Sequence, residues 1–126
     1  MHNDSSAAPV PPGYAVAYLR DVELDSAAIA EYLARIDAIL MPHQGEFLVH
    51  GTAPEAVEGE WPGSIVIIRF PSVDQARSWY ESPGYQAILP LRTEHSQSIA
   101  ALLVGVPAGY RAANLLTSSE QHVAEH

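Results

Sequence analysis

The chain has no cysteine among its 126 residues. Disulfide bonds, thiolate nucleophiles and zinc sites that depend on cysteine are therefore excluded. His43, His50 and His95 show neither an H-x-x-x-H nor an H-E-x-x-H spacing, so a metal would need three separate elements to converge. Glycine-rich nucleotide loops and a G-x-S-x-G nucleophile motif are also missing. We expect no metal, no cofactor and no serine hydrolase chemistry.

Basic residues are scarce, with six against fifteen acidic residues and a formal net charge of −9. This balance argues against a nucleic-acid or anionic-membrane partner, because phosphate binding needs a basic stripe. No apolar run approaches the roughly 20 residues that span a bilayer. The N-terminus lacks the basic and apolar regions of a signal peptide. The expectation is a soluble, cytoplasmic protein.

What the chain does contain is material for a core. Hydrophobic residues make up 48% of it and charged residues only 17%, which is the composition of a globular domain, and the length fits one domain. The polar, proline-rich start predicts a disordered tail at residues 1–13. Periodic patterns occupy residues 14–106, and residues 107–126 are expected to form a C-terminal extension.

The spacing of apolar residues follows two different periods along the domain. Alternation with period two predicts strands, and apolar positions three or four residues apart predict helices. Asp25 or Ser26 is the expected N-cap of the first helix, and Ser72 with Gln75 forms a capping box for the second. The expected strands are residues 14–20, 46–51, 64–70 and 98–106, and the expected helices are residues 26–41 and 72–93, the latter interrupted at 83–84. This βαββαβ order predicts an α+β fold, a ferredoxin-like antiparallel sheet with two helices on one face.

The third and fourth strands carry apolar side chains on both faces. In the third, Ile65 and Ile67 point to one face, whereas Val66, Ile68 and Phe70 point to the other. An antiparallel sheet with one wet face alternates apolar and polar residues, and two helices cover only one face. We therefore expect a homodimer in which the two sheets face each other.

Several short motifs resemble one family. They are GEW at positions 59–61, IRFPSVDQARSWY at 68–80, SPGYQ at 82–86 and the arginine at position 92. Together they resemble the domain of unknown function 1330 family over about residues 14–106, with both tails outside the family pattern. The resemblance implies a dimeric α/β barrel, the fold shared with antibiotic-biosynthesis monooxygenases and polyketide cyclases. It implies no established activity.

Polar groups between the sheet and its helices are the candidates for function, because such barrels hold ligands there. Arg69 and Arg92 are the candidate catalytic cations. A buried guanidinium needs a partner, so each arginine either forms a structural ion pair, for Arg69 with Glu46 or Glu60, or stabilises a substrate carboxylate or enolate. His50 is the candidate general base, since the ordinary histidine pKa lies near 6.5. The alternative is a structural strand histidine.

Alternation along the second strand predicts that His50 shares a face with Glu46, with Phe47 on the other face. Aromatic side chains complete the expected ligand pocket, since tyrosine hydroxyls donate hydrogen bonds from an apolar wall. The alternative for an aromatic on an amphipathic helix is core packing. The candidate substrate-binding residues, including a histidine at the expected pocket mouth, are Tyr18, Trp61, Trp79, Tyr80, Tyr85 and His95.

Three hypotheses for function follow. The first is a cofactor-independent enzyme that performs proton transfer (cyclisation, isomerisation or lactone opening) on an apolar or polyketide-like carbonyl compound. In it His50 acts as base, and Arg69 or Arg92 stabilises an oxyanion. The second is a non-catalytic protein that binds such a small apolar ligand. The third is a monooxygenase of the dimeric α/β-barrel type, which rests on fold analogy.

Overall fold

The computed structural model describes residues 9–116. The elements in chain order are β1 (Gly13–Arg20), α1 (Ala27–Leu40), the short 3₁₀ turn η2 (Met41–His43), β2 (Glu46–Thr52), β3 (Ser64–Phe70), α2 (Val73–Glu81), α3 (Pro83–Thr93) and β4 (Gln97–Val104). The expected βαββαβ order is confirmed, with the second helical region divided into α2 and α3. No helix within residues 9–116 is long and apolar enough to cross a bilayer.

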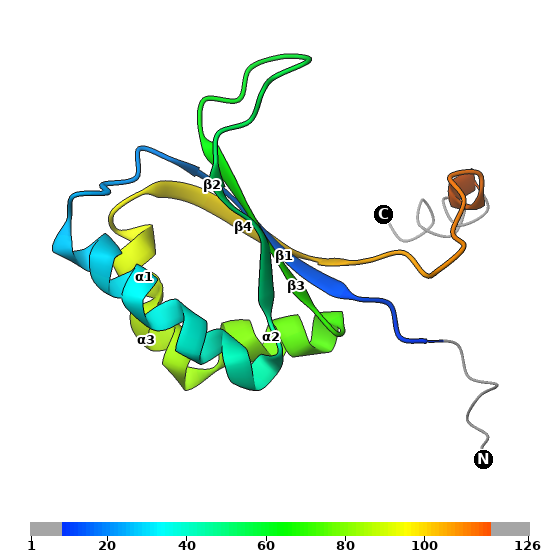
Figure 1. Ribbon diagram of the computed structural model, residues 1–126, viewed down its shortest axis with the longest axis horizontal. Coiled ribbons are helices and arrows are strands. Elements are labelled where there is room, and N and C mark those ends of the chain that lie inside the picture. Colours follow the sequence, from blue (N-terminus) through cyan, green and yellow to red (C-terminus); the bar gives the residue numbers. More distant parts are fainter. Residues whose placement is uncertain (1–8, 117–126) are drawn as a thin grey trace.

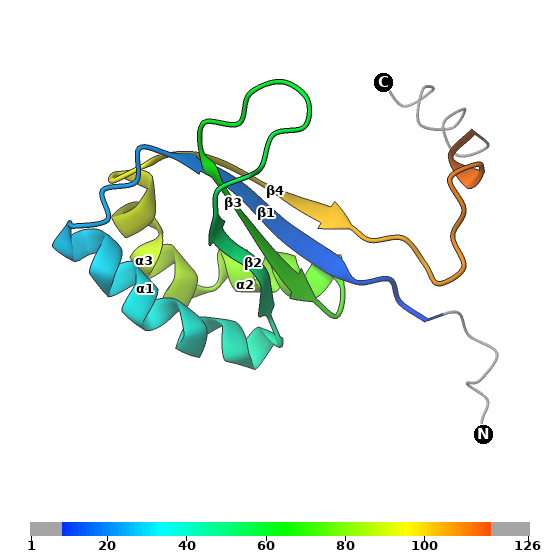
Figure 2. The ribbon, with the colours of Figure 1, turned by 45° about the horizontal axis from the view of Figure 1, so that its top comes forward.

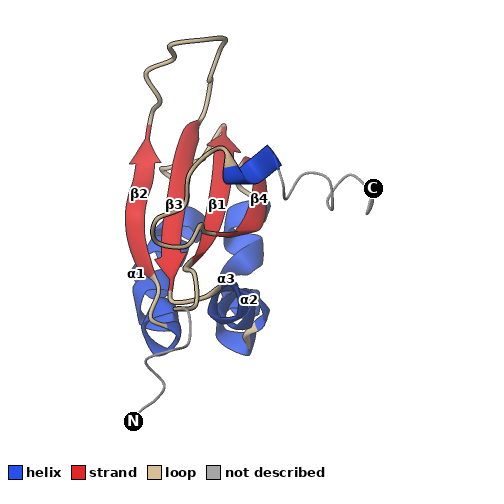
Figure 3. Cartoon of the chain, turned by 90° about the vertical axis from the view of Figure 1, so that its right-hand side faces the viewer, coloured by secondary structure: helices blue, strands red, loops and turns tan. Residues whose placement is uncertain are grey.

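The four strands form one antiparallel sheet in the order β2-β3-β1-β4, and the helices cover one of its faces (Figures 1 and 2). The opposite face is uncovered, and Figure 3 looks onto it with the helices behind. This arrangement is the ferredoxin-like α+β fold that the sequence predicts.

Helix ends follow the local sequence. The Ser26 hydroxyl accepts a hydrogen bond from the Ile29 amide, and the Ser72 hydroxyl accepts one from the Gln75 amide, so both expected N-caps are present. Ser82 caps α3 in the same way, directly after α2 ends. Pro83 at the first helical position of α3 lacks the amide that would otherwise need a partner. The Ser-Pro-Gly break therefore starts a new helix.

The core lies between the sheet and the helices. Its fully buried side chains come from β3, α1, α2 and α3, and none of them is charged. They are Tyr32, Ile36, Leu40, Ile68, Phe70, Ala76, Trp79, Tyr85 and Ile88. The Nε1 atom of Trp79 is the one buried side-chain polar atom without a hydrogen-bond partner among the described residues.

Alternation along β2 is interrupted. The two successive cross-strand pairs are Phe47↔Ile68 and Val49↔Ile67, so β2 advances two residues while β3 advances one. Such a bulge reverses the alternation beyond it. His50 consequently lies on the same face as Phe47, and the two rings stack with centroids 4.3 Å apart. The expectation that His50 shares a face with Glu46 was wrong.

The chain ends lie partly outside the described residues. The strand predicted to begin at residue 14 begins at Gly13, which pairs with both Phe70 and Val104. The predicted fourth strand ends at Val104 rather than at residue 106. Residues 107–116 lead away from the sheet on the side opposite the helices (Figure 1). Most of the predicted tail (1–8) and the end of the predicted extension (117–126) lie outside the described residues.

Candidate functional site

A cavity of about 550 Å³ lies between the helix-covered face of the sheet and the helices. Its floor consists of small and branched apolar side chains from three strands, because short residues on β1 leave space under the helices. These floor residues are Ala15, Ala17, Leu19, Val66, Ile68 and Leu102. Volumes of roughly 300–1,000 Å³ with mainly apolar walls are typical of small-molecule sites.

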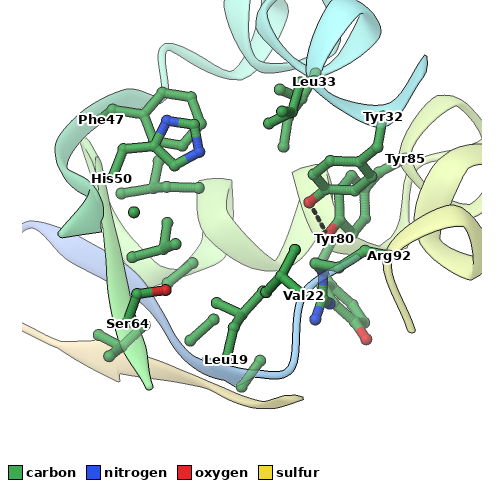
Figure 4. Close-up of a pocket in the computed structure, with 18 of the residues that line it drawn as sticks. Leu19, Val22, Tyr32, Leu33, Phe47, His50, Ser64, Tyr80, Tyr85 and Arg92 are labelled. Carbon is green, nitrogen blue, oxygen red and sulfur yellow. Dashed lines mark hydrogen bonds between the residues drawn. The ribbon is translucent and has the colours of Figure 1, made fainter. Parts of the chain in front are cut away.

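One end of the cavity is polar. The hydroxyls of Tyr32 on α1 and Tyr85 on α3 are 2.7 Å apart and hydrogen-bonded. Arg92, near the end of α3, is only 7% exposed, and its Nη1 atom donates a 2.6 Å hydrogen bond to the Ser98 hydroxyl on β4. Figure 4 shows the Arg92 guanidinium beside the bonded tyrosine pair. Three elements, α1, α3 and β4, thus bring three hydroxyls and one cation together.

Burial controls the charge states at this end. Desolvation raises the pKa of the Tyr32 hydroxyl far above its usual range, and the adjacent Tyr85 raises this pKa further. Burial alone lowers the pKa of Arg92, but the interactions with Tyr85 and Tyr32 outweigh this effect and raise it. Tyr32 is therefore a neutral hydroxyl and Arg92 a permanent cation at physiological pH.

No carboxylate compensates Arg92. The two ion pairs among residues 9–116 are Arg35–Glu31 and Arg77–Asp74, both on helix surfaces. No aspartate or glutamate in the described part of the chain lines the cavity. The ion-pair alternative for Arg92 is thus not observed within the described residues, and a buried cation without a counter-charge is costly.

The opposite side of the cavity carries His50, stacked on Phe47 (Figure 4). The β2 bulge directs His50 toward this side, and its exposure places it at the cavity opening. His50 and Arg92 therefore line one cavity from two sides.

Arg69 does not join them. It lies opposite Glu46 in the sheet, on the uncovered face, and its side chain is exposed. The expectation that Arg69 is buried in the cavity was wrong, because this face of β3 has no helix over it. Tyr18 and Trp61 lie on the same uncovered face, where their rings meet edge to face with centroids 5.7 Å apart. The Tyr18 hydroxyl accepts a hydrogen bond from the Gly63 amide.

The remaining candidates separate into lining and non-lining residues. Trp79, Tyr80 and Tyr85 line the cavity, and Trp79 and Tyr85 are also core residues that are 3% and 2% exposed. His95 follows the end of α3 and does not line the cavity. Its Nδ1 atom lies 3.0 Å from the carbonyl oxygen of Leu91 in that helix. The expected place for His95 at the pocket mouth was wrong.

Sequence reasoning missed Tyr32 and Ser98. Tyr32 lies within the predicted first helix and was not among the candidate residues, although a buried tyrosine hydroxyl needs a hydrogen-bond partner and thereby signals a polar position. Ser98 carried no comparable signal, because its role depends on the packing of α3 against β4.

Groups of three or more histidine, aspartate or glutamate side chains that could hold a metal ion do not occur among residues 9–116.

Comparison with known proteins places this architecture among ferredoxin-like proteins. The hydroxynitrile lyase from Passiflora edulis superposes with a TM-score of 0.60 at 14% identity, covering 82% of this chain and 100% of that one. A dimeric ferredoxin-like protein of unknown function from Thermobifida fusca gives 0.54 at 12% identity, with 82% and 99% covered. SnoaB, a cofactor-independent oxygenase from Streptomyces nogalater, gives 0.53 at 18% identity, with 81% and 100% covered. At these identities the likeness shows the fold. The comparison with curated proteins found no significant match.

The family resemblance carried by the motifs at positions 59–92 agrees with a family model that matches this sequence. The family described as "Domain of unknown function (DUF1330)" matches residues 12–106, which include all four strands and all three α-helices. Since this match covers most of the sequence, the chain belongs to the DUF1330 family.

Proposed function

We propose that the protein is a small-molecule enzyme that performs cofactor-independent proton transfer on an apolar carbonyl compound. The observation that carries this proposal is the uncompensated Arg92 inside an apolar cavity that His50 also lines. A buried cation stabilises negative charge that develops on a ligand oxygen, because few water molecules compete with it. A histidine at the opening supplies a base whose ordinary pKa is close to physiological pH.

In the proposed proton transfer, the two ends of the cavity have different roles. His50 removes a proton from a carbon next to the carbonyl group, the electrons of that C–H bond form a C=C bond, and the π electrons of the C=O bond move onto the oxygen. Arg92 and the hydroxyls of Tyr32 and Tyr85 stabilise the resulting enolate. If the substrate is a β,γ-unsaturated carbonyl compound, the imidazolium then returns the proton to the γ-carbon of the dienolate, which completes an isomerisation. An enolate that attacks a second carbonyl group gives a cyclisation instead.

Proteins with this fold include a hydroxynitrile lyase and a cofactor-independent oxygenase. The oxygenase supports monooxygenation as a second candidate, because an enolate formed in the cavity is electron-rich enough to reduce O₂. The third possibility is binding without turnover. All three use the same cavity, so they differ in what happens after the ligand is bound.

Proton transfer is measurable without the natural substrate. With 2-tetralone as an apolar, enolisable ketone in D₂O, we expect the wild-type protein to accelerate exchange of the α-protons, followed by NMR. The variant His50→Gln is expected to reduce the protein-dependent rate by about 10²- to 10⁴-fold, the usual contribution of a positioned general base.

His43→Gln is the matched control, since His43 lies on η2 and does not line the cavity. Wild-type exchange no faster than in buffer, with binding of the ketone retained, would favour the non-catalytic protein. Oxygen uptake that accompanies loss of the ketone would favour the monooxygenase.

We also propose that two copies pack their uncovered sheet faces together, as the apolar residues of β1, β3 and β4 suggest. Ile99 and Leu103 on this face are 73% and 49% exposed in the single chain, and Val16 lies between Ile67 and Ala101 in the register. A dimeric protein with the same fold supports the formation of a dimer.

Leu103→Asp tests the sheet-to-sheet interface. Two carboxylates would be buried in it without partners, so we expect the dimer dissociation constant to rise at least about 100-fold, which corresponds to roughly 3 kcal/mol. Sedimentation equilibrium measures the change. Met41→Asp is the control, because Met41 is 74% exposed on the helix side. A Leu103→Asp protein that stays dimeric would assign the interface to another surface.

A further inference from the structure

The charge of the cavity contrasts with that of the chain. The protein carries a formal net charge of −9, yet Arg92 is the only fully charged side chain among residues 9–116 that lines the cavity. Glu23 and Glu94, which flank this end in the loop after β1 and beyond α3, are exposed and do not line it. The cavity is therefore an electropositive site in an acidic protein.

Counting hydrogen-bond donors shows what this site lacks. Arg92 has five N–H donors and no acceptor, and the oxygens near it belong to the hydroxyls of Ser98, Tyr32 and Tyr85. The bond between the tyrosines uses one of their two hydroxyl hydrogens. The second hydroxyl hydrogen is left to donate to a ligand. Donors thus exceed acceptors, and the missing group is an oxygen anion.

The shape of the site narrows the choice of anion. A guanidinium is planar and pairs best with two oxygens of one planar group. The rings of Tyr32, Tyr80 and Tyr85 line the same region, and aromatic faces favour flat, conjugated ligands. A tetrahedral phosphate or sulfate ester matches neither feature as well.

We propose that the ligand binds as a planar organic anion with two conjugated oxygens, a 1,3-dicarbonyl enolate or a carboxylate, on an apolar body. One oxygen contacts Arg92, and the other accepts the remaining hydroxyl hydrogen of the Tyr32–Tyr85 pair. The apolar body extends toward Leu33 and Phe47. This inference rests on the proposed small-molecule function and narrows its substrate: the ligand carries the negative charge that Arg92 binds before any reaction. His50 then acts on a different C–H bond, at the far end of the conjugated system, and not on the bond whose loss forms this anion.

Matched pairs of ligands test the charge requirement. The first pair is 5-phenylcyclohexane-1,3-dione, which is ionised at neutral pH, and its neutral enol ether 3-methoxy-5-phenylcyclohex-2-enone. The second pair is cinnamate and cinnamamide. We expect isothermal titration calorimetry to show that at least one anion binds ten or more times more tightly than its neutral partner, since a charge-assisted hydrogen bond to Arg92 is stronger than a neutral one.

Variants of Arg92 test whether this residue causes the preference for the anion. Arg92→Gln should abolish the preference for the anion, and Arg92→Lys should retain part of it, because lysine keeps the charge but not the planar fork. Arg35→Gln is the control: it makes the same change on an exposed arginine of α1 that pairs with Glu31. Circular dichroism and thermal unfolding confirm that each variant is folded.

The outcomes separate the two proposals. A preference for the enolate alone identifies 1,3-dicarbonyl compounds, and a preference for cinnamate alone identifies carboxylates; both support the inference. Equal binding of anion and neutral partner, or a preference that survives Arg92→Gln, overturns it and leaves the proton-transfer proposal standing. Anion preference without α-proton exchange overturns only the proposed enzyme. Failure of all four compounds to bind overturns this inference, and the proton-transfer proposal is then decided by the exchange assay with 2-tetralone.

Discussion

Replacing Gly13 with alanine is expected to lower the free energy of unfolding by about 3 kcal/mol, at the upper end of what overpacking usually costs. A Cβ atom at this position would lie 2.4 Å from both the amide nitrogen and the Cα atom of Val73. These are backbone atoms at the start of α2, so no side-chain rotation relieves the clash. Chemical denaturation, with the midpoint and slope fitted together, measures the loss.

Gly84→Ala is the matched control. A Cβ there would meet only side-chain atoms of Ile39, the nearest at 3.6 Å, which is ordinary contact. Gly84 lies in the first turn of α3, where alanine is the better helix former by up to about 1 kcal/mol. We expect this variant to be as stable as the wild type or slightly more stable. Equal stability of Gly13→Ala and the wild type would show that α2 does not pack this closely on β1.

Replacing Arg92 with methionine is expected to separate stability from binding. The change removes a buried charge that has no carboxylate partner, which is favourable, and loses the hydrogen bond to Ser98, which costs about 1 kcal/mol. We expect the ligand-free protein to be as stable as the wild type or about 1 kcal/mol more stable, as found when buried charges are replaced by apolar residues. Affinity for the preferred anion should fall by about 100-fold, because the charge-assisted contact disappears. Thermal unfolding without ligand and calorimetry with ligand measure the two effects.

Ile88→Ala provides the contrast on the same helix. Ile88 is fully buried and packs in the core, so its truncation should cost about 2–5 kcal/mol. If Arg92→Met destabilised the ligand-free protein by a similar amount, Arg92 would be a structural residue. The cavity would then be better described as an apolar binding site.

The expected behaviour of Arg92 reflects a common property of functional sites. A charged group that a ligand will pair with is left without a counter-charge in the free protein, and stability is lost as a result. In the same region the buried Nε1 atom of Trp79 has no hydrogen-bond partner among the described residues.

The sequence by itself determined the elements and their order. Ser26 and Ser72 cap helices because their hydroxyls satisfy amides only three residues away. Such interactions are local, so they can be read from neighbouring residues. The apolar pattern on both faces of β3 was equally visible, because side chains along a strand alternate with a fixed period. The same two kinds of local information, capping and periodicity, were enough to recognise the ferredoxin-like arrangement.

Tertiary structure alone decided which residues share the cavity. The β2 bulge turns His50 to the helix-covered face, and whether a strand bulges depends on its pairing with β3, not on its own residues. Arg69 and Arg92 looked equivalent in sequence, yet only Arg92 lies under the helices. The bond between Tyr32 and Tyr85 joins residues 53 positions apart. Periodicity assigns a residue to a face, but the side of the sheet that the helices cover and the strand register are set by long-range packing.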